Sequence, residues 1–235
     1  EFRRVLFRSY EWGRAIYAMI NPDYVVSTGH FMPYAIRAQE ATANGNFFEV
    51  LCSNISDGQL YSNIWQVENG RLFQTAALFM FGMLLGRRKY LIKSEESVRF
   101  WKKMLKGAVL AFIPLYCLKT FVPDLLTNPS VQIPYKIAVP SYANFAFMII
   151  LVSIFTLLWF KKEKGYGWQS LLIPYGRMSL TNYISQSIMG VIIYYGFGLA
   201  MYKYAGATAS LLIALLIFTV QLIFSRWWLA RHKRS

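Results

Sequence analysis

The feature that most constrains this sequence is a series of five apolar stretches, separated by short polar segments, that begins near residue 71. A membrane-spanning helix needs about 20 mostly apolar residues. Since a backbone inside a bilayer must satisfy its own hydrogen bonds, apolar stretches of this kind predict helices. The sequence therefore predicts an all-α, polytopic transmembrane helix bundle with about five spans, at residues 72–86, 107–122, 141–160, 179–202 and 207–228.

The composition agrees with a membrane location. Hydrophobic residues make up 56% of the chain and charged residues only 15%, whereas about a quarter of the residues in a soluble domain are charged. A net charge of +14 would suit a nucleic-acid partner if the basic residues formed a patch on a soluble fold. They lie instead in short runs between the apolar stretches, so we expect the lipid bilayer as partner and no nucleic acid.

The basic residues also predict the orientation of the chain in the membrane. Sixteen lie in alternate connections, at residues 87–106, 161–177 and 226–234, and only Lys119, Lys136 and Lys203 lie in the connections between them. Cytoplasmic loops carry an excess of Lys and Arg. We therefore expect a multi-pass protein of the bacterial cytoplasmic (inner) membrane, with the C-terminus in the cytoplasm and residues 10–70 outside it.

The part of the chain before residue 71 differs in character. Residues 10–70 contain no window apolar enough to span a bilayer, and we interpret them as an extracytoplasmic loop with one or two amphipathic helices at the membrane surface. Residues 1–9, EFRRVLFRS, resemble the translation of a sequencing adapter and are predicted to be non-native. On that interpretation the chain is a fragment that lacks further N-terminal helices, and residues 71–235 form its transmembrane domain.

Few residues suggest metal or cofactor chemistry. The only cysteines and histidines are Cys52, Cys117, His30 and His232, without metal-site spacing, and no phosphate-binding loop is present. We expect no metal and no cofactor. His30 could serve as a general base, although an ordinary loop histidine is the simpler interpretation. No Asp or Glu lies within the five stretches, so a carboxylate proton relay in the membrane has no candidate.

Polar residues at the start of the fourth stretch form the main candidate site. Ser179, Asn182 and Gln186 are spaced to share one face of a helix, and Arg177 precedes them. Such a face must meet protein or a water-filled cavity, because lipid cannot satisfy it. It could bind a substrate, with Arg177 contacting an anionic group, or it could join neighbouring helices by hydrogen bonds, which is the simpler interpretation.

A second candidate lies at the outer end of the first stretch, where Arg71 and Gln74 share a helix face. These two side chains could stand at the mouth of a substrate pocket. Glu68 precedes Arg71 by three residues, and a local ion pair between them is the alternative.

Two motifs in this order resemble a known family. They are NGRLFQTAALFMFGMLLGRRK, residues 69–89, and YGRMSLTNYISQSIMG, residues 175–190; the chain then ends near FSRWWLAR, residues 224–231. Together they resemble the YeiB-like family of bacterial inner-membrane proteins, also called domain of unknown function 418, over residues 65–234. The resemblance implies a role in transport, and a distant relation to multi-helix membrane acyltransferases. In those relatives the catalytic histidine and arginines lie largely in the N-terminal half, so the catalytic residues of this chain stay unknown.

Three functional hypotheses follow. The protein could take part in acyl-group transfer to an extracytoplasmic acceptor, with the polar face at 179–186 and Arg71 lining the passage of a small-molecule or acyl substrate. It could transport a small solute along the same face. It could also have a structural role, with that face serving only helix packing.

Overall fold

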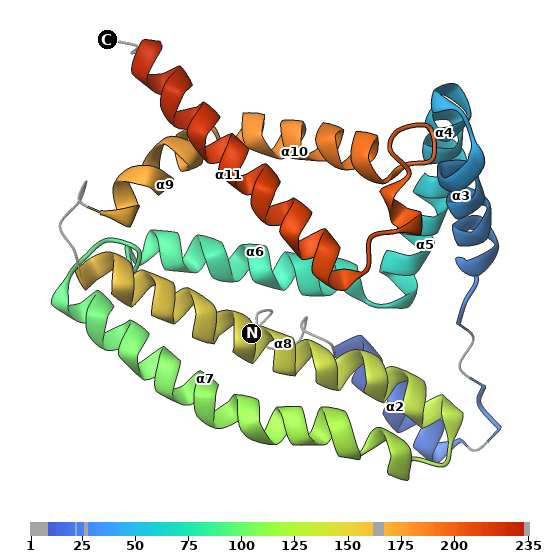
Figure 1. Cartoon of the computed structure of the whole chain (residues 1–235). Helices are drawn as coiled ribbons and strands as arrows, with labels where there is room; N and C mark the ends of the chain where they lie inside the picture. The colour runs from blue at the N-terminus through green and yellow to red at the C-terminus, as the bar shows by residue number, and fades with distance from the viewer. Residues whose placement is uncertain (1–8, 22, 26–27, 162–166, 233–235) are drawn as a thin grey trace. The chain divides into compact units, whose positions relative to one another are not determined.

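A computed structural model describes residues 9–21, 23–25, 28–161 and 167–232 of the chain. All regular structure in these residues is helical, which confirms the all-α prediction (Figure 1). The predicted non-native segment lies outside the described residues, except for Ser9 at the start of α2 (Ser9–Ile20). Two compact units form: Glu1–Phe31 with Ser62–Lys161, and Met32–Tyr61 with Lys162–Ser235. The helix α5 (Gln59–Glu68) runs from the second unit into the first.

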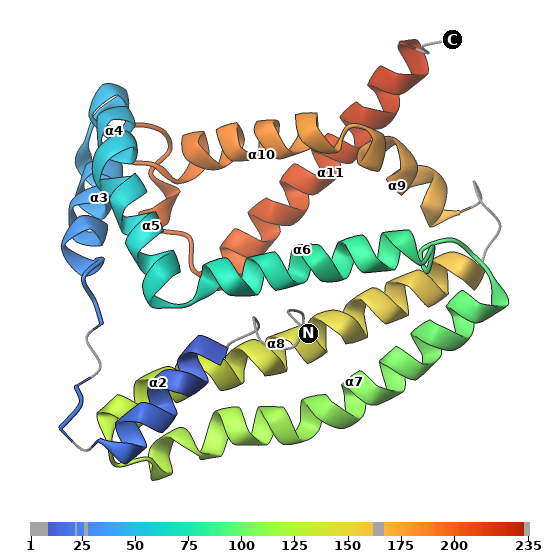
Figure 2. The ribbon, with the colours of Figure 1, turned by 180° about the vertical axis from the view of Figure 1, so that it is seen from behind.

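The first unit is built on an antiparallel pair of long helices, α7 (Glu95–Phe121) and α8 (Pro129–Lys161), which lie side by side in Figures 1 and 2. Ser94 caps α7 by accepting a hydrogen bond from the backbone of Ser97 at 3.0 Å. The connection contains the short 3-10 helix η2 (Pro123–Leu125). At 1.5 Å per residue, the pair measures about 40 and 50 Å, more than the bilayer core requires.

A third helix joins this pair at one end. The buried side chains of Leu85 in α6 (Arg71–Arg87), Trp101 in α7 and Phe160 in α8 pack together. The Trp101 indole also donates a hydrogen bond to the backbone oxygen of Tyr90 at 2.8 Å. The basic α6–α7 connection and the end of α8 therefore lie at the same end of this unit, as the charge distribution requires. At the other end α2 packs against α8, with the alanines Ala15 and Ala18 buried.

The second unit contains α9 (Trp168–Arg177), α10 (Ser179–Tyr194), the 3-10 helix η3 (Met201–Lys203) and α11 (Ala207–Arg231). It also contains α3 (Met32–Asn44), α4 (Phe47–Ser53) and the π-helical turn η1 (Asn54–Gly58). Gly196, after α10, donates a backbone hydrogen bond to Thr42 in α3 at 2.9 Å. A Cβ atom there would lie 1.9 Å from the backbone oxygen of Ala43, so this close approach requires glycine.

The expected spans are helices of different lengths. The helices α7 with η2, α8 and α11 are each long and apolar enough to cross a membrane. The helices α6 and α10 form at the first and fourth apolar stretches but have 17 and 16 residues, about 25 Å each; their crossing of the bilayer stays a prediction. Residues 10–70 contain α2, α3, α4 and α5, which is more helix than the one or two expected.

Candidate functional site

The polar face predicted on α10 divides into one enclosed residue and two exposed residues. Asn182 is only 2% exposed, whereas Ser179 and Gln186 are exposed. Arg177, the last residue of α9, is exposed as well. Only the middle of the predicted face is therefore surrounded by protein within this unit.

Asn182 links α10 to both neighbouring helices. Its side-chain nitrogen donates to the backbone oxygen of Tyr175 in α9 and to the hydroxyl of Ser225 in α11, each at 3.1 Å. The Ser225 hydroxyl lies 3.2 Å from the Asn182 side-chain oxygen, to which it can donate in return. The amide thus has partners on two helices, which is the role of interhelical contact that polar residues play in membrane bundles.

Gln221 extends this contact one turn along α11. Its side-chain nitrogen donates to the backbone oxygen of Asn182 and to the hydroxyl of Ser185, both at 2.8 Å. The Tyr175 hydroxyl lies 3.4 Å from the Gln221 side-chain oxygen and donates to it. Together Tyr175, Asn182, Ser185, Gln221 and Ser225 form what we call the α9–α11 network. Since its central amides are hydrogen-bonded within the protein, the network is suited to packing.

The sequence signal for this network lies in α11 as well as in α10. Gln221 and Ser225 are four residues apart in a mostly apolar stretch and so share one face of α11. Gln221 is 4% exposed and Ser225 is fully buried. Polar faces on two apolar helices each require hydrogen-bond partners, and here the faces of α10 and α11 hydrogen-bond to each other.

A different group of polar residues surrounds Glu68, the last residue of α5. Its carboxylate accepts hydrogen bonds from the backbone nitrogens of Gly29 and His30, at 3.0 and 3.1 Å. The His30 ring nitrogen Nδ1 lies 2.6 Å from the same carboxylate. The backbone oxygen of Glu68 accepts from Arg14 at 3.2 Å, and Arg14 also contacts Glu11 at 3.5 Å. We call Glu11, Arg14, His30 and Glu68 the Glu68 cluster.

The geometry defines how the His30 ring is held. A carboxylate only accepts hydrogen bonds, so Nδ1 carries the proton that it donates to Glu68. In the neutral ring the other nitrogen, Nε2, is then the proton acceptor. The Glu68 side chain is 13% exposed and the His30 side chain 63% exposed, so Glu68 holds an imidazole whose side chain is mostly exposed.

The position of Glu68 follows from the turn between α5 and α6. Gly70 has φ = 57°, a left-handed conformation that glycine adopts without strain and that commonly ends a helix. Beyond this turn, the guanidinium of Arg71 lies over the Trp65 ring, 5.1 Å from its centroid. The Arg71 side chain is exposed and Gln74 is partly buried. Arg71 and Gln74 therefore lie directly after the Glu68 cluster in the chain, and in the same unit.

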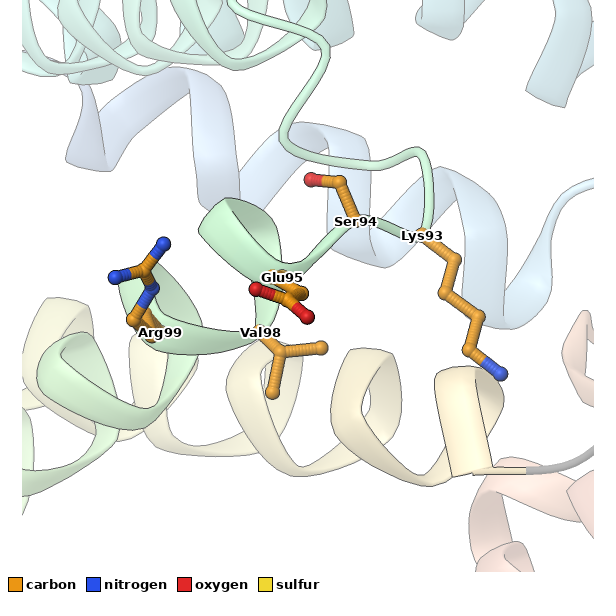
Figure 3. A pocket seen from close by; sticks show the side chains of 5 residues that line it. All are labelled: Lys93, Ser94, Glu95, Val98 and Arg99. Atoms are coloured by element: carbon orange, nitrogen blue, oxygen red, sulfur yellow. The ribbon is translucent and has the colours of Figure 1, made fainter.

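A separate surface hollow of about 660 Å³ lies at the start of α7, lined by Lys93, Ser94, Glu95, Val98 and Arg99. The side chains of Lys93 and Arg99 extend away from each other, with Glu95 between them (Figure 3). Because the two cations do not converge, the hollow does not form a site for one anion. Within the described residues no group of three or more His, Cys, Asp or Glu side chains forms a possible metal site.

The sequence comparisons define the family. Residues 85–234 match the family described as "Protein of unknown function (DUF418)". The chain belongs to the DUF418 family. This confirms the YeiB-like resemblance, and with the three membrane-compatible helices it indicates a DUF418 membrane protein. The α9–α11 network lies inside the range that matches DUF418, whereas the Glu68 cluster lies before it.

A protein of Bacillus subtilis is similar to this chain over a short segment. Over 54 residues the chain is 43% identical to "Uncharacterized protein YxaH" of Bacillus subtilis (strain 168). The match covers 23% of this chain and 13% of the relative, well under two thirds of its length. No solved structure matches the chain.

Proposed function

We propose that this DUF418 protein is a membrane acyltransferase that moves an acyl group from a thioester donor to a hydroxyl group of an extracytoplasmic acceptor. The observation that supports this proposal is the His30–Glu68 pair, a solvent-accessible imidazole held by a carboxylate 2.6 Å away. This is the arrangement of a general base with an orienting acid.

The proposed side of the membrane follows from the basic connections. By the positive-inside rule, residues 87–106 lie in the cytoplasm, together with the C-terminus, in the bacterial inner membrane. The helix α6 begins at Arg71 and ends at Arg87, in that basic segment. Its beginning, and the Glu68 cluster just before it, then lie on the extracytoplasmic side.

The proposed reaction uses His30 to transfer one proton. Nε2 accepts the proton of the acceptor hydroxyl while the hydroxyl oxygen attacks the carbonyl carbon of the donor. A carbon–oxygen bond forms and the carbon–sulfur bond breaks. His30 then returns the proton to the departing thiolate. Glu68 keeps the ring in the required tautomer and stabilises the imidazolium during the step.

The predicted substrate contacts fall into two groups. Arg71 and Gln74 follow the Glu68 cluster directly, and we retain them as contacts for an anionic or polar part of the substrate. Arg177, Ser179 and Gln186 are exposed and stay predicted contacts along a substrate passage. Transport would require the whole α10 face to line a path, but Asn182 is enclosed and bonded to α9 and α11. The geometry therefore supports acyl transfer better than transport.

The proposal is tested in cells that make the full-length protein, by measuring alkali-labile acyl esters in the cell envelope with mass spectrometry. We expect His30→Asn to lower the protein-dependent ester content about 100-fold, the scale of a lost general base. His232→Asn is the matched control, because His232 stacks on Trp228 at the far end of the chain. Ester content at the wild-type level in His30→Asn, with the protein present in the membrane, would refute the proposal.

A further inference from the structure

An apolar groove of about 640 Å³ runs between α7 and α8. This volume lies in the range of small-molecule sites in proteins, which are mostly apolar with a few polar groups. Nearly all of its lining side chains are apolar, and they come from both helices: Phe100, Lys103, Met104, Gly107, Ala108, Ala111, Leu115, Tyr142, Phe145, Ala146 and Ile149.

The middle of the groove is open because one of its walls lacks a side chain. A Cβ atom built on Gly107 would meet nothing within 4 Å. The neighbouring lining residues Ala108, Ala111 and Ala146 are also small. A flexible hydrocarbon chain could lie against this wall without displacing any protein atom.

The charge in the groove is at one end only. Lys103 is its one charged lining residue. It follows by two residues Trp101, which belongs to the packed core that joins α7 to the ends of α6 and α8. Arg99, Lys102 and Lys106 lie on the same turns of α7. The groove thus runs from a basic helix end into the apolar part of two helices that are long enough to cross a membrane.

These observations specify an amphiphile with a negative head and an apolar tail. The cytoplasmic leaflet of a membrane carries anionic lipids, and basic pockets between helices on that side bind their head groups. We propose that the groove binds an anionic phospholipid, with one acyl chain along α7 and α8 and the phosphate at Lys103. This site is separate from the Glu68 cluster and does not depend on the proposed acyl transfer.

The test is native mass spectrometry of the full-length protein in detergent, titrated with dioleoyl-phosphatidylglycerol or with dioleoyl-phosphatidylcholine. We expect the wild type to bind phosphatidylglycerol more tightly. Lys103→Gln should weaken phosphatidylglycerol binding about fivefold, the effect of one basic residue near an anionic head group, and leave phosphatidylcholine binding unchanged. Lys102→Gln is the matched control. It removes the same charge from the preceding residue, which does not line the groove, and should change binding less than twofold.

A second variant tests the acyl chain. Gly107→Leu places a side chain in the open part of the groove and should weaken binding of both lipids about tenfold, the effect of uncovering about two methylene groups. It should not impair folding, since leucine is the better helix former. Gly190→Leu, at another helical glycine with open space around its Cβ position, should have no effect on binding.

The outcomes separate the proposal from its alternatives. Equal binding of the two lipids by the wild type, or a loss with Lys102→Gln as large as with Lys103→Gln, would overturn the site at Lys103. If another helix of the protein fills the groove, Gly107→Leu should lower the thermal midpoint and leave lipid binding unchanged, which would also overturn it.

Discussion

The α9–α11 network and the Glu68 cluster are both polar groups next to apolar helices, but they are built in opposite ways. The network is uncharged, its central residues Asn182 and Gln221 are nearly fully buried, and each of these amides is hydrogen-bonded to neighbouring helices. The Glu68 cluster is made of charged or ionisable side chains, and its His30 ring is mostly exposed.

This difference indicates which group can act on a ligand. A ligand that bound Asn182 would have to break hydrogen bonds that join three helices. The buried polar groups left without partners would lower the stability of the protein. A ligand that approached His30 would meet a ring already oriented by Glu68, in a side chain that is 63% exposed. We therefore assign packing to the network and propose chemistry for the Glu68 cluster, and the predictions below test that division.

The largest effect is expected within the Glu68 cluster. Groups that act as one catalytic unit are strongly non-additive. Glu68→Gln should lower the envelope ester content by at least about tenfold, because a neutral amide orients the ring poorly. The double variant His30→Asn with Glu68→Gln should lose about 100-fold, no more than His30→Asn alone. Ester content measured by mass spectrometry, normalised to protein in the membrane, gives both values.

Additive losses in that double variant would show that the two residues act separately and would break the assignment. Glu49→Gln is a suitable control for loss of a carboxylate in the same N-terminal part of the chain. Glu49 forms the capping box of α4 with Asn46, and its replacement should not change ester content per molecule.

An intermediate effect, on stability rather than on activity, is expected in the α9–α11 network. Asn182→Leu should lower the free energy of unfolding by about 1–2 kcal/mol, because the buried Ser225 hydroxyl loses its partner. The activity of the protein that stays folded should not change. Unfolding in mixed detergent micelles measures the first quantity, and the ester assay the second.

Gln186→Leu provides the comparison for that variant, since Gln186 lies on the same predicted face but is exposed. It should change the free energy of unfolding by less than about 0.5 kcal/mol, as surface substitutions do. If instead Asn182→Leu abolished activity without loss of stability, the ligand interpretation of Asn182 would be correct and ours wrong.

The helical fold could be predicted because its cause is local. A helix is the structure that satisfies all backbone hydrogen bonds within one apolar segment of a bilayer, and the three helices long enough to cross a membrane follow from that. The helices in residues 10–70 are harder to predict because their sequence signals are short. The capping box at Asn46 and Glu49, for example, marks the start of α4 with only two residues.

The candidate site was harder to predict because it depends on contacts between distant residues. The face of α10 is visible from spacing, but its burial at Asn182 depends on Gln221 and Ser225, about 40 residues away. His30 and Glu68 are 38 residues apart, and neither carries a motif. Periodicity shows which residues share a helix face and cannot show which other segment that face meets.

A smaller effect is expected between Ser185 and Gln221, and it tests whether the network holds its helices together through side chains. Their hydrogen bond of 2.8 Å joins α10 to α11. In a double-mutant cycle with Ser185→Ala and Gln221→Ala, we expect a coupling energy of about 0.6 kcal/mol and at most about 1.7 kcal/mol, the range found for membrane helices. Zero coupling would mean that the contact does not contribute and that apolar packing alone holds the two helices.

The smallest effect is expected for an exposed ion pair, Arg37 with Asp57. This pair tests whether function depends on the geometry of the Glu68 cluster or only on the presence of a charged contact. Both Arg37 nitrogens Nε and Nη2 donate to one Asp57 oxygen, at 3.0 and 2.7 Å. This hydrogen bond raises the pKa of Arg37 further above its ordinary value, so the guanidinium stays charged. The Arg37 side chain is nevertheless 52% exposed, and solvent and salt screen such pairs.

Arg37→Ala should therefore shift the thermal midpoint by less than about 2 °C and leave ester content unchanged. Thermal unfolding at low and high salt, together with the ester assay, measures both. The pair has a distance close to that of His30 and Glu68 and lies in the same N-terminal part of the chain. A large loss of activity in Arg37→Ala would mean that any charged contact in residues 10–70 supports function, and the specific role of His30 would lose its basis. No loss would leave the oriented, solvent-accessible ring as the property that distinguishes the Glu68 cluster.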